Sequence, residues 1–348
     1  MAKKKNKFLL TLSVTLCIIL IGAYYIYSNL IVGKVNLKDK NYTYIYVETN
    51  DNFEDIIKTL EEELDIKEGK SFEWLAKKME LDKNIHPGKY RINNGMTKRQ
   101  IINLIKYNKN EKIKLSYNSQ IHNIDEFISY TSDKLELTET ELEEILIDDE
   151  FLEEHFNLDP DNAFALIPYN SIEVNWAISV KDLFELFEKY YKNIWNENRI
   201  KLAKKIGYKK ADIITLASIV QSESNISSEQ QKIAGVYINR LERNMELQAD
   251  PTLKFATKNF NVQRVLNVDK EIDSPYNTYK YKGLPPGPIC LVDVKSIDNV
   301  LNFTKHNYLF FCAKPSLNGY SDFSETYEKH KKYALAYQKE MNKRNINR

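Results

Sequence analysis

The feature that most constrains this chain is its amino-terminal end, where a short basic segment precedes a long uncharged one. Four lysines lie within the first seven residues, and no charged side chain then occurs from Phe8 to Tyr27. An apolar helix of about 20 residues is the length that crosses a hydrocarbon core of about 30 Å. We therefore expect a cytoplasmic tail at residues 1–7 and a transmembrane helix at 8–28, with a cleaved signal peptide as the alternative.

The basic tail also predicts an orientation. Lysines on a short leading segment hold that segment in the cytoplasm. Residues 29–41 then form a polar stalk, and the remainder of the chain lies outside the cytoplasmic membrane. The expected location is the cytoplasmic membrane, crossed once, with the working part on the extracytoplasmic side.

Composition excludes several classes of protein. Lysine and arginine number 50 against 49 acidic residues, so a net charge of +1 gives no global field for a polyanion, and nucleic acid is not an expected partner. Three cysteines cannot form a disulfide framework, although Cys290 and Cys312 could pair in an oxidising compartment. No clustered metal ligands occur, so we expect neither a metal nor an organic cofactor.

Secondary-structure patterns divide the exported part into three regions. Residues 42–110 alternate strand and helix signals and predict a small α+β module. Residues 111–200 are mainly helical in pattern. Residues 201–345 mix helical and loop segments and predict a second, larger α+β domain.

A carboxylate stands out at the end of an apolar helix in the last region. Ile213, Leu216, Ala217 and Val220 follow helical spacing, and three residues further the same face carries Glu223. Burial and the negative end of the helix dipole both disfavour the ionised carboxylate and raise its pKa, which suits a general acid. The alternatives are a structural ion pair and a last-turn residue that reaches water.

The segments after this helix are rich in amides, hydroxyls and tyrosines. They carry no metal-ligand cluster and no glycine-rich phosphate loop between residues 239 and 288. Such side chains match an uncharged, hydroxyl-rich ligand, for which carbohydrate is the natural candidate. A well-packed cluster of loops is the alternative.

Four segments resemble the endolytic murein transglycosylases of the YceG-like family: LASIVQSES, EQQKIAGVYINRLERNMELQADPTLKFA, SPYNTYKYKGLPPGPI and DFSETYEKHKKYALAYQ. The resemblance covers most of Tyr44–Lys339. It implies a single membrane span, a LysM-like subdomain at 42–110, a connecting region at 111–200 that forms part of the substrate groove, and a catalytic domain at 201–345. It also places Glu223 at the catalytic glutamate.

The sequence departs from the family pattern at three places. Gln221 replaces the first acidic residue of the catalytic motif. Gly319–Phe323 lacks the histidine that relatives often show there, and Ile167–Glu173 breaks a Pro-x-Thr-Tyr-Glu pattern, which puts that side of the groove in doubt.

The resemblance implies a lytic mechanism that needs one carboxyl group. Glu223 would protonate the oxygen between N-acetylmuramic acid and N-acetylglucosamine, then take a proton from the muramic C6 hydroxyl, leaving a 1,6-anhydro end. The expected partners are peptidoglycan glycan strands, with wall synthases as a hypothesis. The candidate sugar-binding residues are Asn239, Gln248, Asp250, Tyr276, Asn277 and Tyr279, with Asp250 as electrostatic support.

Two other functions stay open at this point. A true hydrolase would use Glu223 with Asp250 or Glu173 as a second carboxylate, because ordinary glycosidases need two. A wall-binding scaffold without activity would act through the 42–110 module.

Overall fold

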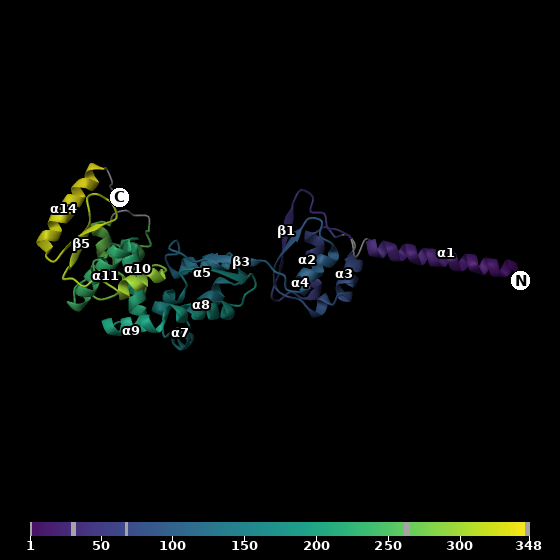
Figure 1. Cartoon of the computed structure of the whole chain (residues 1–348), viewed down its shortest axis with the longest axis horizontal. Helices are drawn as coiled ribbons and strands as arrows, with labels where there is room; N and C mark the ends of the chain where they lie inside the picture. The colour runs from purple at the N-terminus through teal and green to yellow at the C-terminus, as the bar shows by residue number, and fades with distance from the viewer. Residues whose placement is uncertain (1, 29–32, 67–68, 261–264, 345–348) are drawn as a thin grey trace. The chain divides into compact units, whose positions relative to one another are not determined.

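The computed structural model describes residues 2–28, 33–66, 69–260 and 265–344, which form two compact units of mixed α+β structure (Figure 1). Unit 1 comprises the chain up to Lys114 together with residues 134–136 and 173–178. Unit 2 comprises the remaining residues.

The amino-terminal segment is helical. Helix α1 (Ala2–Ile26) covers most of the predicted span, and apolar side chains along it, such as Leu16 and Ile21, are exposed. A search of the described residues nevertheless finds no helix with both the length and the apolarity for a membrane crossing. The transmembrane helix at 8–28 therefore stays a prediction, and residues 29–32 of the predicted stalk lie outside the described residues.

Unit 1 follows the predicted alternation of strand and helix. Strands β1 and β2 pair antiparallel, with Tyr42 opposite Asn93 and Val47 opposite Gly88. Asn52 and Thr97 each close a capping box at a helix start, which satisfies free backbone amides there. The elements in chain order are β1 (Tyr42–Val47), α2 (Phe53–Glu63), α3 (Gly69–Lys78), η2 (Leu81–Lys83), β2 (Gly88–Asn93) and α4 (Lys98–Lys106).

Apolar side chains fill the interior of unit 1. Leu60, Phe72 and Ile101 are fully buried there, each from a different helix. Strands β3 (Lys112–Ser116) and β4 (Ser171–Asn175) form a separate two-stranded sheet, and the boundary between the units falls within both strands.

The first half of unit 2 is helical. Phe184, Phe187 and Tyr191 of its longest helix are buried, so the aromatic pattern of that helix serves the core. The elements are α5 (Ile124–Ser132), α6 (Glu139–Leu146), α7 (Asp149–Phe156), η3 (Pro160–Leu166), α8 (Val180–Ile194) and α9 (Glu197–Ile206).

The second half of unit 2 is built around helix α10, which packs against α11 and α13. Strands β5 and β6 pair antiparallel and pack against α14. The elements are α10 (Lys210–Glu223), α11 (Ser227–Glu242), α12 (Asp250–Ala256), η4 (Asn267–Glu271), α13 (Val294–Leu301), β5 (Phe310–Ala313), β6 (Ser321–Ser324) and α14 (Tyr327–Lys343).

Helix α10 is buried more completely than its sequence pattern predicts. The pattern indicates one apolar face, but every residue from Ile213 to Val220 is buried. Two of these residues are polar, and Ser218 donates its hydroxyl hydrogen to the carbonyl of Thr215 at 2.7 Å. The bond removes the cost of enclosing that hydroxyl, so polar residues are tolerated on the inner helix.

Candidate active site

Glu223 is the last residue of α10, and a tyrosine from the next helix contacts it. The chain leaves the helix in extended conformation at Ser224. Tyr237 of α11 donates its hydroxyl hydrogen to Glu223 Oε1 at 2.8 Å. The Tyr237 side chain is buried, with its ring edge-on to Phe311 at 5.8 Å between centroids. The carboxyl group is therefore held from inside the unit.

The pKa of Glu223 is raised to about 7 from the ordinary value of 4.5. Burial is the largest cause, because an ion loses hydration there, and the negative charge of Asp250 adds to it. The Tyr237 hydrogen bond and the Lys254 ammonium oppose the rise. The raised pKa predicted from the sequence is confirmed. A carboxyl that titrates near neutrality suits a group that gives and then takes a proton.

A second carboxylate lies beside the first. Asp250 opens α12, and its Oδ1 accepts a hydrogen bond from the hydroxyl of Tyr279 at 2.5 Å. Burial and the charges of Asp250 and Glu223 raise the pKa of Tyr279. The structure therefore brings Glu223, Asp250 and Tyr279 into one electrostatic cluster.

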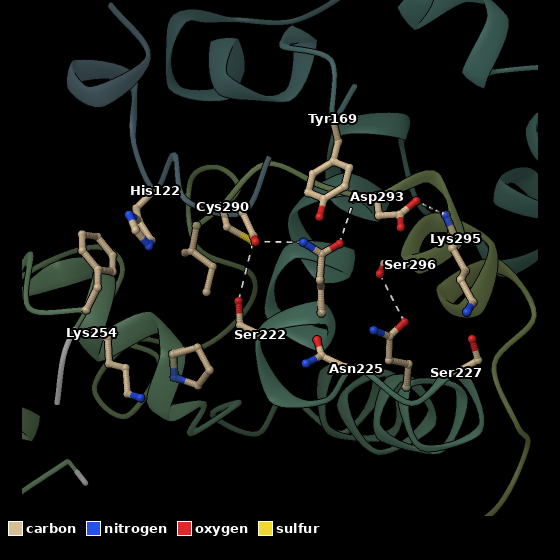
Figure 2. A pocket seen from close by; sticks show the side chains of 16 residues that line it. His122, Tyr169, Ser222, Asn225, Ser227, Lys254, Cys290, Asp293, Lys295 and Ser296 are labelled. Carbon is tan, nitrogen blue, oxygen red and sulfur yellow. Dashed lines mark hydrogen bonds between the residues drawn. The ribbon is translucent and has the colours of Figure 1, made fainter. Parts of the chain in front are cut away.

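A polar cavity of about 330 Å³ is lined by chain neighbours of this cluster, although Glu223, Asp250 and Tyr279 are not themselves among its lining residues. Figure 2 shows the side chains that line this cavity. Three of its lining residues come from the two helices that carry these carboxylates. Ser222 belongs to α10, whereas Pro251 and Lys254 belong to α12. Other side chains of the lining are Gln221, Asn225, Gln230, Ser296, His122 and Tyr169. Amides and hydroxyls prevail, which suits a ligand rich in hydroxyl groups.

Three residues of the region 111–200 line the cavity, and the assignment of this region to a substrate groove stays a prediction. The three residues are Ser119, His122 and Tyr169. The His122 ring stacks on Phe260 at 4.1 Å between centroids, and its Nδ1 lies 2.9 Å from Glu126. Tyr169 belongs to the segment whose family pattern is broken, yet it still reaches the cavity.

The departure at Gln221 has a structural explanation. Its Nε2 donates to the carbonyl of Leu291 at 2.9 Å, and its Oε1 accepts from the backbone amide of Asp293 at 2.8 Å. The side chain thereby fastens the segment before α13 to α10. An ionised glutamate could accept from Asp293 but could not donate to Leu291.

Two predicted sugar-binding amides hold the protein's own loops. Asn239 donates Nδ2 hydrogens to the carbonyls of His306 and Tyr308 at 2.8 and 2.9 Å. Asn277 is fully buried, and its Nδ2 donates to Lys270 and Ile272 at 2.9 and 2.8 Å. The donors of both amides are occupied by these carbonyls, which favours a role in fixing loops, and the sugar-binding role stays a prediction.

The remaining residues predicted to bind or cleave the sugar have different surroundings. Gln248 is exposed, at a φ of 53°, and lies outside the cavity lining. Tyr276 packs against Phe255 at 4.5 Å between ring centroids, and burial raises its pKa to about 12. Glu173 is an exposed residue of unit 1. Asp250 is the carboxylate whose charge acts on Glu223.

The structure also answers two points that the sequence leaves open. Cys290 and Cys312 are free thiols, as is Cys17. In the segment that lacks the family histidine, the backbone amide of Ser321 donates to the buried Glu229 carboxylate at 2.8 Å. The described residues include no group of three or more histidine, cysteine or acidic side chains placed to hold a metal ion.

Sequence reasoning missed two residues near Glu223. Neither Tyr237, within α11, nor Lys254, within α12, is among the candidate residues that the sequence predicts. The signal for Tyr237 is that a buried tyrosine hydroxyl needs a polar partner, although the sequence does not name the partner.

A carboxyl whose pKa is raised toward neutrality, close in the chain to a cavity lined by amides and hydroxyls, is typical of an enzyme that acts by acid–base chemistry on a polar ligand. The chain belongs to the YceG-like family, whose sequence model matches residues 45–335.

Individual relatives agree with the family assignment. The chain is 35% identical over 176 residues to the endolytic murein transglycosylase of Bacillus subtilis strain 168, covering 50% of this chain and 46% of that one. It is 37% identical over 106 residues to the protein of the same name from Streptococcus pneumoniae strain D39, covering 29% and 19%. The chain thus matches less than half the length of these curated relatives.

A solved structure is also similar. The crystal structure of a YceG-like protein from Listeria monocytogenes superimposes with a TM-score of 0.54 at 25% identity, over 84% of this chain and 99% of that one.

Proposed function

We propose that this protein is an endolytic peptidoglycan lytic transglycosylase that cleaves the β-1,4 bond between N-acetylmuramic acid and N-acetylglucosamine. The observation that carries the proposal is the Glu223 carboxyl, whose pKa of about 7 leaves a substantial protonated fraction at neutral pH beside a polar cavity. Membership of the YceG-like family and the names of the relatives support the choice of substrate.

The reaction uses Glu223 twice. Its proton passes to the glycosidic oxygen, which leaves with the electron pair of the bond to C1. The resulting carboxylate takes the proton of the C6 hydroxyl as that oxygen forms its bond to C1, so the carboxyl is regenerated and no water is consumed. Asp250, whose charge acts on Glu223, would stabilise the positive charge that develops at C1.

A hydrolase is the second candidate, and a specific observation favours it. Asp250 interacts electrostatically with Glu223, and a carboxylate pair is what hydrolysis by a glycosidase needs. Asp250 is already bonded to the Tyr279 hydroxyl, which fits electrostatic support better than attack on the sugar.

Location and context are part of the proposal. The uncharged run from Phe8 to Tyr27, preceded by lysines, supports anchoring in the cytoplasmic membrane with the catalytic part outside. A tethered enzyme would cut nascent strands near the point where synthases release them, and so end their elongation. Unit 1, at the position of a LysM-like subdomain, would bind the wall.

Mass spectrometry of the released glycans tests the reaction. Purified sacculi digested with the 348-residue chain should give 1,6-anhydro ends, and Glu223→Gln should lower the rate by at least about 100-fold, the usual contribution of a general acid. Reducing ends would establish the hydrolase. If Glu223→Gln digested sacculi as fast as the unchanged chain, the proposed site would be wrong.

A further inference from the structure

The two oxygens of the Glu223 carboxyl have different surroundings. Oε1 accepts the hydrogen bond from Tyr237. Oε2 has no hydrogen-bond partner among the described residues, and it is not one of the fully enclosed unpartnered atoms, so solvent reaches it. Oε1 is thus hydrogen-bonded to the protein, and Oε2 remains accessible to a substrate.

We propose that the Tyr237 hydroxyl is a positioning group that holds Oε1, so that Oε2 is the atom that carries the proton to and from the substrate. This inference rests on the proposed function and adds the path of the proton. Tyr237 does not contact the sugar in this scheme; it acts through Glu223.

The position of the Tyr237 side chain restricts which acceptor its hydroxyl can bond. The Tyr237 side chain is 1% exposed, and its ring is fixed against Phe311. A buried hydroxyl without a partner is costly, and Glu223 Oε1 is the acceptor that the structure provides for it. Because the ring is immobile, the carboxyl it binds loses freedom to rotate away from the substrate.

Each proton transfer balances with this assignment. While Oε1 accepts from Tyr237, the acidic hydrogen resides on Oε2 and passes to the glycosidic oxygen as the bond to C1 breaks. The carboxylate keeps the Tyr237 bond at Oε1. Oε2 then receives the C6 hydroxyl hydrogen as the new bond to C1 forms, and Tyr237 never loses its own hydrogen.

Several other titratable groups face Glu223 or Tyr237, and replacing Tyr237 by phenylalanine leaves all of them in the chain. Asp250 and Lys254 face it from α12, and Tyr279 lies on the loop that follows. Arg240 faces Tyr237 from the same helix. The Tyr237 bond opposes the rise in the Glu223 pKa that burial causes, so its removal should raise that pKa further.

The decisive variant is Tyr237→Phe, which removes the hydroxyl and keeps the ring. We expect kcat on soluble glycan strands to fall about tenfold with KM unchanged, since a hydrogen bond to a charged group contributes about that factor. The limb on which activity falls with rising pH should move up by about one pH unit, because the protonated acid persists to higher pH. Tyr191→Phe, which removes another buried hydroxyl of the same unit, should leave both values unchanged.

A double variant separates positioning from folding. If Tyr237 acts through Glu223, adding Tyr237→Phe to Glu223→Gln should lower the residual rate by less than twofold. Equal losses in both backgrounds, or a tenfold loss without a shift in the pH limb, would show a structural role and overturn the proposal. An inactive Glu223→Gln together with an unaltered Tyr237→Phe would overturn this inference alone and leave the proposed function standing.

Discussion

The interiors of the two units differ in chemistry. In unit 1 the buried side chains are almost all hydrocarbon, and Lys98 is the one buried charged residue among those described there. Unit 2 encloses many polar groups around α10 and α11, including Glu229, Gln230, Arg240 and Asn277.

The difference shows where acid–base chemistry can be placed. A hydrocarbon interior stabilises the fold, but it contains no charged or hydrogen-bonding groups that could shift the pKa of a catalytic side chain. A polar interior costs free energy unless each group is bonded, and in return it holds a carboxyl at a chosen pKa. Unit 2 encloses such polar groups around Glu223, at the expense of some stability.

Replacing a buried charged group that bonds several backbone carbonyls gives the largest expected effect. The Arg240 guanidinium donates to three backbone carbonyls, those of Leu309, Glu246 and Leu247, at 2.6 to 3.1 Å. Arg240→Met should lower the free energy of unfolding by about 4 kcal/mol, because those carbonyls lose a buried charged partner. Urea denaturation followed by circular dichroism measures it. The exposed Arg243→Met is the control, and equal values for the two would remove the contrast between the interiors.

A substitution that creates a cavity in the hydrocarbon interior of unit 1 tests whether that unit contributes to stability alone. Leu60 is fully buried, so Leu60→Ala should cost about 3 kcal/mol of stability. Because unit 1 supplies no proton-transfer group, kcat on soluble strands at low temperature should stay within twofold of the original. A large loss of kcat in a folded Leu60→Ala protein would contradict this separation of roles. Lys58→Ala, an exposed change on the same helix, serves as the control.

The pH dependence of stability gives an effect of similar size. The folded pKa of Glu223 is about 7 and its ordinary value is 4.5, so folding favours the protonated form. Its stabilising contribution is complete below pH 4.5 and is lost as the pH rises through 7, by about 3 kcal/mol. The difference in unfolding free energy between the original chain and Glu223→Gln should change by that amount between pH 4 and 8. A difference that stays constant would mean that the carboxyl is not desolvated.

Asn277→Ala distinguishes a loop anchor from a sugar ligand. Its two carbonyl partners, Lys270 and Ile272, would lose their donors, and stability should fall by about 2 kcal/mol. Thermal unfolding and KM measured on the same preparation decide the question. A raised KM at unchanged stability would restore the sugar-binding role predicted from the sequence.

The smallest effect is expected at Gln221. Gln221→Glu should cost about 1 kcal/mol at pH 7, where an ionised carboxylate faces the carbonyl of Leu291. A protonated carboxyl can donate to that carbonyl, so the cost should vanish near pH 4. Denaturation at the two pH values checks the prediction, and a cost that is larger at pH 4 would contradict it.

Part of the site was predictable because its signals are local. An apolar helix that ends in a carboxylate is visible as periodicity, and Glu223 was identified in this way. Burial of the helix up to Val220 follows from the same pattern, and a raised pKa of the carboxyl at its end is expected from it. The strand and helix order of unit 1 was predictable for similar reasons, because caps such as Thr97 act within one turn.

The partners of polar side chains were not predictable. Asn239 and Asn277 have the composition expected of sugar ligands, yet their amides bind loop carbonyls. Asn239 reaches residues 67 and 69 positions further along the chain. Tyr237 matched an apolar helix face, and only packing shows that its hydroxyl meets Glu223.

By itself the sequence determined that a carboxyl would end a buried helix beside a run of amides, hydroxyls and tyrosines, since hydrophobic periodicity and composition act over short distances. Tertiary structure decided which of those polar groups bind the protein and which stay open to a ligand. The physical reason is that a hydrogen-bond donor has the same chemistry whether it meets a backbone carbonyl or a sugar, and only the folded chain sets which acceptor lies within reach.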